Sequence, residues 1–323
     1  MVAMKNASLN LGLVAALALP MLALAGCAAN GSSNSSGASS STSSDSGGGD
    51  SRSPTVIRAP SAEDGTARTF DAATNEFMEN GLHQFSRGDP AWEETRARWL
   101  TKGEREQRFL VSAMFAALIK AQRAGYSDLV QRARHELVLI GRPSVGFMAG
   151  ILATGTVDTV YDAIADEDKP IRVDDDVRRE AAEVLALIGA PATAATVAAI
   201  DRSETKSGRR FALQALGNMG DRGGAAAADG LIRWSRADDW VLRVEAVNGL
   251  RTFSDVRTRQ SLEASLSDEE SLVRQKAAEA LYKRGEKASL PALRRAQKKA
   301  RNAGKLGESR RLEGMVRAIE TRP

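Results

Sequence analysis

The chain has 323 residues, with 45 Lys and Arg against 41 Asp and Glu, which gives a formal net charge of +4. Only two His and one Cys are present, so the sequence excludes a disulfide within the chain and a zinc site built from Cys and His. Aromatic residues make up 5% of the sequence while Ala and Leu are abundant, a composition that favours an all-α protein and argues against an enzyme.

The N-terminus has the pattern of a secretory signal peptide. Lys5 precedes an apolar stretch at 11–25 that ends in small residues. This stretch is shorter than the roughly 20 apolar residues that a transmembrane helix needs. We therefore expect export from the cytoplasm.

The motif Leu24-Ala25-Gly26-Cys27 follows the apolar stretch and resembles the bacterial lipobox. The resemblance implies cleavage after residue 26, a lipidated Cys27 and attachment to a membrane of the cell envelope. Because residue 28 is Ala and not Asp, it also indicates the periplasmic face of the outer membrane if the host has two membranes. The alternative is an ordinary signal peptide followed by an incidental cysteine.

Residues 27–60 are dominated by Ser and Gly and contain almost no apolar side chains. Such a segment cannot bury enough surface to offset the entropy of ordering the chain. We expect a disordered tether between the acylated cysteine and the folded part.

Residues 61–125 carry helical patterns that do not fit the repeats described below. These helices are expected at 70–85, 92–100 and 104–124. We interpret this region as a divergent helical N-terminal cap, because the end units of repeat arrays face water on one side.

An internal repeat covers most of residues 126–304. Four segments align without gaps, and in each an Ala is preceded by Arg three positions earlier and followed by Leu four positions later. The alanines are Ala181, Ala212, Ala246 and Ala277, the leucines are Leu185, Leu216, Leu250 and Leu281, and the arginines are Arg178, Arg209, Arg243 and Arg274. A weaker fifth copy has Ala133 and Leu137.

The offsets of the repeat predict one helix per copy. Positions −4, 0, +4 and +7 relative to the Ala lie on one helical face. Glycine at +8 suits a left-handed C-cap, as in Gly141, Gly189, Gly220 and Gly285. Second apolar helices are expected from Ser144, Ala192, Ala226, Thr258 and Leu290. Such helix pairs cannot bury their apolar faces alone, so they must stack.

The order of acidic residue, Val-Arg, Ala, Leu, Gly and Pro resembles HEAT repeats, particularly the short form seen in phycobilisome-lyase-like arrays. The copy with Gly208-Arg209 departs from the Val-Arg pattern. The resemblance implies an all-α, right-handed α-solenoid of stacked helix pairs. It also implies that the four arginines form a structural ladder, each pairing with an acidic side chain in the preceding turn. These acids are Asp174, Glu204, Asp239 and Glu270.

The C-terminal segment 305–323 is expected to close the stack with a capping helix. Its apolar side chains Leu306, Leu312, Val316 and Ile319 would turn inward. Residues 286–323 also carry a net charge of +7. This basic end is suited to anionic lipid, an anionic envelope polymer or an acidic protein. Nucleic acid is not expected, because no aromatic side chains are interleaved with the cations.

The acidic stretch at 162–176 lacks the Gly and Glu that a calcium loop needs in register. We interpret its carboxylates as helix caps on a solvated loop, with a docking point for a basic partner as the alternative. We found no catalytic motif, no metal site and no cofactor fingerprint.

We therefore expect a non-enzymatic scaffold that binds an unidentified protein partner. If the repeat helices line the inner face of the solenoid, as the resemblance implies, positions −1 and +2 point toward that partner. These positions are Glu180, Glu183, Phe211, Gln214, Glu245, Asn248, Lys276 and Glu279, with Trp234 and Trp240 as candidate hot spots near a loop. Two alternatives remain: an envelope enzyme or accessory lyase with its site in the N-terminal cap, and a structural component that binds anionic polymer through the basic end.

Overall fold

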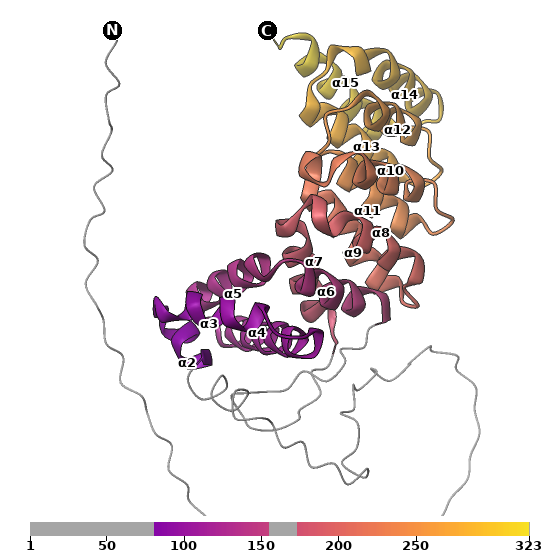
Figure 1. Cartoon of the computed structure of the whole chain (residues 1–323). Helices are drawn as coiled ribbons and strands as arrows, with labels where there is room; N and C mark the ends of the chain where they lie inside the picture. Colours follow the sequence, from indigo (N-terminus) through magenta and orange to yellow (C-terminus); the bar gives the residue numbers. More distant parts are fainter. Residues whose placement is uncertain (1–80, 155–172, 323) are drawn as a thin grey trace, which may run out of the picture. The chain divides into compact units, whose positions relative to one another are not determined.

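The computed structural model describes residues 81–154 and 173–322. All of these residues belong to one compact unit, Arg52–Pro323. Every regular element within the described ranges is a helix, and none is a strand (Figure 1). The predicted signal peptide, Cys27, the tether and most of the acidic stretch lie outside the described residues.

The helices form two layers, with alternate helices in each. The first layer contains the helices of the repeat motif, and neighbouring members contact one another along the stack. Its members are α5 (Ser127–Ile140), α7 (Asp175–Ile188), α9 (Lys206–Met219), α11 (Trp240–Leu250), α13 (Ser271–Arg284) and α15 (Leu306–Glu320). Second-layer helices connect them, namely α4 (Glu104–Ala124), α6 (Arg142–Thr154), α8 (Ala190–Arg202), α10 (Gly224–Trp234), α12 (Val256–Ser265) and α14 (Leu290–Asn302). The fold is thus an all-α solenoid of stacked helix pairs, as predicted.

The repeat register is confirmed by burial. In every copy the Ala at position 0 and the Leu at position +4 are completely buried. These side chains are Ala133, Leu137, Ala181, Leu185, Ala212, Leu216, Ala246, Leu250, Ala277 and Leu281. The small Ala lets neighbouring helices approach, while the Leu fills the space between them.

The helix ends follow the predicted signals in part. Gly285 follows the last residue of α13 in the left-handed conformation, with φ 69° and ψ 16°, so the predicted cap is confirmed there. Gly141, Gly189 and Gly220 also have a positive φ after their helices, but their ψ values of −121°, −134° and −145° lie outside the left-handed helical region, so the prediction of that cap is wrong for them. Pro191 and Pro291 lie in the first turns of α8 and α14, where a missing N–H leaves no hydrogen bond unmade.

In the part of the N-terminal cap that the structure describes, three helices precede the first repeat. The short helix α2 (Leu82–Arg87) precedes α3 (Ala91–Leu100) and α4, so the helices expected at 92–100 and 104–124 are confirmed. Helix α4 packs against α5 and α6, as a second-layer helix does. Arg96 of α3 lies 2.6 Å from Glu136 of α5 and thereby connects the cap to the first repeat. Most of the helix expected at 70–85 lies outside the described residues.

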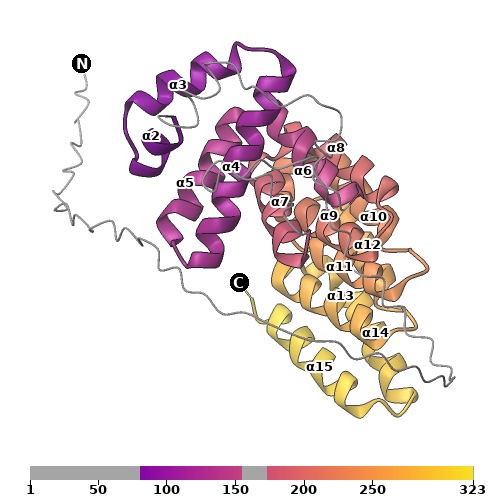
Figure 2. The same cartoon turned by 90° about the horizontal axis from the view of Figure 1, so that it is seen from below.

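Helix α15 closes the first layer at the C-terminal end (Figures 1 and 2). Leu312, Val316 and Ile319 are buried as predicted. The prediction for Leu306 is wrong, because it is 57% exposed. Leu306 is the first residue of α15, and the buried face of that helix begins one turn later, at Ser309.

Among the described residues, no single helix has the length and apolar character needed to cross a membrane. The bent pair α5 and α6, with 113° between its helices, passes the same length and composition test as a pair.

Candidate functional site

Two of the four ladder arginines, Arg243 and Arg274, form nearly identical sets of hydrogen bonds in the C-terminal repeats, each to two backbone carbonyls and one carboxylate. We call each such set a bracket. One Nη atom of Arg243 donates to the backbone carbonyls of Ala237 and Asp238, at 3.0 and 2.9 Å. The rest of its guanidinium forms a bidentate pair with Asp268, at 2.9 and 3.0 Å. Arg243 of α11 therefore connects the loop that precedes α11 to Asp268, which lies in the loop before the next first-layer helix, α13.

Arg274 repeats this geometry one unit later. It donates to the carbonyls of Asp268 and Glu269, at 2.9 and 2.8 Å, and forms a bidentate pair with Glu308 of α15 at 2.8 Å in both contacts. Hydrogen bonding to Glu308 raises the pKa of Arg274, and hydrogen bonding to Asp268 raises the pKa of Arg243. Both arginines are structural.

The predicted partners of the arginines are wrong for these two repeats. Asp239 accepts hydrogen bonds at the N-terminus of α11 and pairs with Lys206 of the preceding repeat at 2.6 Å. It therefore caps a helix and does not bind Arg243. The acids that were missed are Asp268, nine residues before Ala277, and Glu308 in α15.

The ladder is incomplete in the two earlier repeats. Arg178 lies 3.7 Å from Asp175, and burial lowers the pKa of its guanidinium. The buried Nε atoms of Arg178 and Arg209 have no hydrogen-bond partner among the residues that the structure describes. The positions that correspond to Asp268 are Ser203 and Ala237, neither of which supplies a carboxylate.

The Arg274 bracket predicts a loss of stability in acid. Hydrogen bonds from Arg274 hold the pKa of Glu308 below its usual 4.5, so the pair stabilises the fold above that pH and is lost as pH falls through the lowered pKa. We expect Glu308→Gln to lower the free energy of unfolding at pH 7 by about 1 to 3 kcal/mol. Chemical unfolding between pH 7 and pH 3 measures the free energy of unfolding of both proteins. We expect that of Glu308→Gln to fall less steeply in acid than that of the unsubstituted protein.

Glu313→Gln is the matched control for this measurement. Glu313 lies on the same helix and forms an exposed ion pair with Arg317. Because exposed pairs contribute little, we expect a change of at most about 0.5 kcal/mol. Equal effects of the two substitutions would contradict the assigned role of the bracket.

The structure places two of the eight predicted contact residues in the interior. Glu180 is 1% exposed and forms a bidentate pair with Arg134 of α5, at 2.8 Å in both contacts, while Phe211 is 3% exposed in the core. These two predictions are wrong. Position −1 faces the neighbouring first-layer helix, and Glu245 at that position likewise lies 3.2 Å from Arg210 of α9.

The remaining predicted positions are half-buried on the first-layer surface. Lys276 and Glu279 pair with each other at 3.0 Å, and Asn218 donates to Glu183 at 3.2 Å. Gln214 and Asn248 make no side-chain hydrogen bond among the described residues. They occupy the same +2 position on the neighbouring helices α9 and α11.

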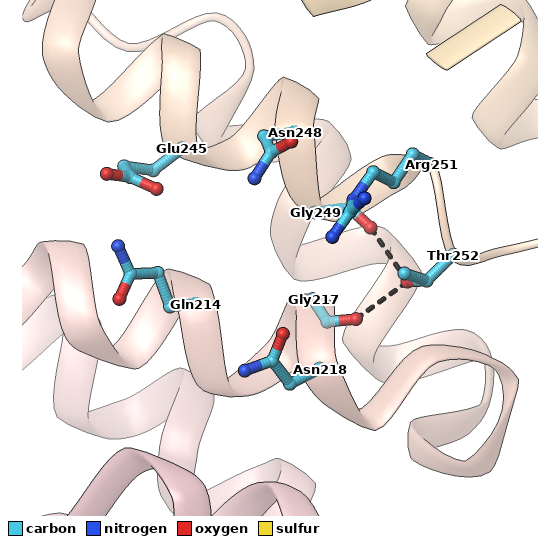
Figure 3. Close-up of a pocket in the computed structure, with 8 residues that line it drawn as sticks. All are labelled: Gln214, Gly217, Asn218, Glu245, Asn248, Gly249, Arg251 and Thr252. Atoms are coloured by element: carbon cyan, nitrogen blue, oxygen red, sulfur yellow. Dashed lines mark hydrogen bonds between the residues drawn. The ribbon is translucent and has the colours of Figure 1, made fainter. Parts of the chain in front are cut away.

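Gln214 and Asn248 border a small polar hollow between α9 and α11 (Figure 3). Glu245, Asn218 and the exposed Arg251 complete its rim. Because Glu245 is paired with Arg210, the groups that the hollow offers to a ligand are the carboxamides and the Arg251 guanidinium, which suit neutral polar groups and carboxylates.

Close approach of the two helices forms the floor of this hollow. A Cβ atom on Gly217 would lie only 2.7 Å from the Cα of Gly249, so Gly217 has no room for a side chain. A Cβ atom on Gly249 would lie 3.0 Å from a methyl group of Leu231 and 3.2 Å from the Cα of Gly217, which is a tight fit. The Thr252 hydroxyl lies within hydrogen-bond distance of both glycine carbonyls, 2.7 Å from Gly217 and 2.9 Å from Gly249 (Figure 3). These three residues are not among those predicted above, although two glycines within predicted helices were a signal.

The two candidate tryptophans differ in exposure. Trp234 is half-buried against the core, with the Arg233 guanidinium 5.8 Å from its ring centre. Trp240 is 44% exposed at the start of α11 and leaves a large apolar ring on the surface. Within the described ranges, no group of three or more His, Cys, Asp and Glu side chains is placed to hold a metal ion.

Residues 228–304 match a family model described as HEAT repeats. This stretch contains the side chains of Arg243, Arg274 and Asp268, which form the two brackets together with Glu308. Glu308 lies beyond the matched residues. No curated protein matches the chain. The match and the stacked helix pairs together support a HEAT-repeat protein.

Proposed function

We propose that this protein is a non-enzymatic interaction scaffold of the bacterial cell envelope, anchored to a membrane through lipidated Cys27. Its repeats are of the short, phycobilisome-lyase-like type, and a protein partner binds the surface of the first layer. HEAT repeats suggest an interaction solenoid, and the lipobox-like residues 24–27 support the anchor.

The observation that carries the binding proposal is the pair of carboxamides at Gln214 and Asn248. A carboxamide both donates and accepts hydrogen bonds, as a peptide group does. Packed helices are about 8–10 Å apart, and an extended chain advances about 3.3 Å per residue, so the two carboxamides can meet peptide groups about three residues apart. The first-layer surface therefore suits an extended segment of a partner protein.

Site-specific photocrosslinking in intact cells tests this surface. We expect a photoreactive residue at Gln214 or Asn248 to yield the same crosslinked partner. Gln260 is the control, because it is an exposed carboxamide on α12 in the second layer. A partner captured equally from Gln260, or none from either first-layer position, would contradict the proposed face.

The membrane anchor has its own test. We expect Cys27→Ser to prevent acylation and to move the protein from the membrane fraction to the soluble fraction, because two or three acyl chains provide stable attachment. Radiolabelled fatty acid and cell fractionation measure both effects. A second substitution, Ser33→Cys, restores a thiol outside the motif and is expected not to restore the anchor. Unchanged membrane association of Cys27→Ser would refute it.

A further inference from the structure

Two open hollows lie next to each other along α14, near the C-terminal end of the stack. One lies between α12 and α14, and the other continues toward the start of α15, with a volume of about 340 Å³. That volume is within the range of ligand sites in proteins. They share four residues and so form one continuous groove, which we call the α14 groove. The shared residues are Leu266, Ser267, Ala296 and Lys299.

The groove exists because α14 packs closely against α15 and less closely against α12 and α13. Ala296, Ala300 and Ala303 of the α14 segment contribute short side chains to its lining, opposite Leu266 at the end of α12. The groove therefore has an apolar floor as well as charged walls.

The acidic side chains of the groove are already paired. Glu263 forms an ion pair with Arg259 at 2.8 Å, Asp268 is held by Arg243, and Glu308 is held by Arg274. Glu269 also lies 3.2 Å from Arg243. Arg243 carries one positive charge against Asp268 and Glu269 together, so Glu269, whose side chain is 83% exposed, is the one acid of the groove that leaves an unbalanced negative charge.

Of the four basic side chains that line the groove, Arg274 is neutralised by Glu308, and the other three are not neutralised in this way. Arg295, Lys299 and Lys305 are exposed, and none forms an ion pair among the described residues. In the second layer, Asp201 of α8 pairs with Arg233 of α10, and Asp229 of α10 pairs with Arg257 of α12. This series of pairs does not continue to α14, which carries five Lys and Arg and no acid.

We propose that the α14 groove is a second binding site, separate from the first-layer surface, and that it binds an acidic peptide segment of a protein. Carboxylates of the segment contact Arg295, Lys299 and Lys305, and its apolar side chains contact Leu266 and the alanines of α14. An acidic segment matches the charge of the groove. The lining of Leu266, Ala296 and Ala300 lies inside a hollow, which a peptide side chain can enter and a planar membrane surface does not.

Fluorescence anisotropy with defined probes tests the proposal. The protein is the full chain with Cys27→Ser, and the probe is a fluorescein-labelled peptide in which Glu and Leu alternate. We expect it to bind more tightly than the peptide in which Gln replaces Glu, and more tightly than the peptide in which Ser replaces Leu. We also expect the affinity to fall as salt is added, because the contacts are ionic.

Charge reversal provides a matched pair of variants. We expect the double variant Arg295→Glu, Lys299→Glu to raise the Kd of the Glu-Leu peptide by about tenfold or more. Lys298→Glu, Arg301→Glu changes the charge of the same helix equally, but neither residue lines the groove. We expect it to change the Kd by less than about threefold, because exposed charges at a distance are screened. Circular dichroism melts verify that both variants fold.

Three results would overturn the proposal. The first is equal binding of the Glu-Leu and Gln-Leu peptides, including no binding of either. The second is an equal loss in the two double variants, which would indicate diffuse attraction to the whole basic end. The third is binding of phosphatidylglycerol vesicles without binding of the acidic peptide, which would assign the cations to a membrane surface.

Discussion

Gly208→Val is expected to destabilise the protein strongly, although it restores the Val-Arg pattern of the repeat. A Cβ atom at Gly208 would lie 2.2 Å from the backbone oxygen of Leu152 and 2.4 Å from the Ser203 hydroxyl. The local backbone has little freedom to move, since the amide of Glu204 also donates to the Ala153 carbonyl at 3.3 Å. We expect a loss of about 3 kcal/mol or more in the free energy of unfolding, measured by urea denaturation.

Gly314→Val is the control for this steric argument. Gly314 lies within α15, is exposed, and has no atom within 4 Å of an added Cβ. Because Val and Gly differ little in helix propensity, we expect a change of at most about 0.5 kcal/mol. A neutral or stabilising Gly208→Val would contradict the contact between α9 and the end of α6.

Leu216→Ala is expected to lower the free energy of unfolding by about 2 to 5 kcal/mol, the cost of a cavity at a buried leucine. Leu216 is completely buried at position +4 of its repeat, and its side chain lies beside Gly230 of α10. Few small side chains can move into the space that the leucine leaves, because the neighbouring helices are held by the rest of the stack. Thermal and urea unfolding measure the loss.

Leu187→Ala is the matched control, since Leu187 lies two positions beyond the buried Leu185 of α7 and is 43% exposed. We expect a change below about 1 kcal/mol. Similar losses for the two leucines would contradict the repeat register, because that register alone predicts which one is buried.

The sequence was sufficient to predict the helical layers. Ala and Leu at fixed offsets mark the buried face of each first-layer helix, and Gly or Pro marks most of the ends. These are local signals, since helical periodicity and capping depend on residues within one or two turns. The exception is α11, which ends at Leu250, whereas the register places the cap position at Ser254. Thr252 instead bonds with the glycine carbonyls of α9 and α11 there.

The partners of the arginines depended on contacts between repeats. The resemblance to HEAT repeats implied Asp239 as the partner of Arg243, but Asp239 accepts a hydrogen bond from the amide of Val241 and pairs with Lys206. Asp268 is 25 residues away in the chain and reaches Arg243 only because the next repeat stacks on it. No spacing within one repeat predicts such a pair.

The sequence by itself determined the repeat, the all-α class, the buried Ala and Leu positions and the basic character of the C-terminal end, because each follows from composition or from periodicity within a helix. Only the tertiary structure decided which polar positions are available for binding. It buried Glu180 and Phe211 against neighbouring helices, left Gln214 and Asn248 half-exposed, and opened a groove beside α14. The physical reason is that exposure depends on how closely successive helices approach, which the small residues and ion pairs of two different repeats determine together.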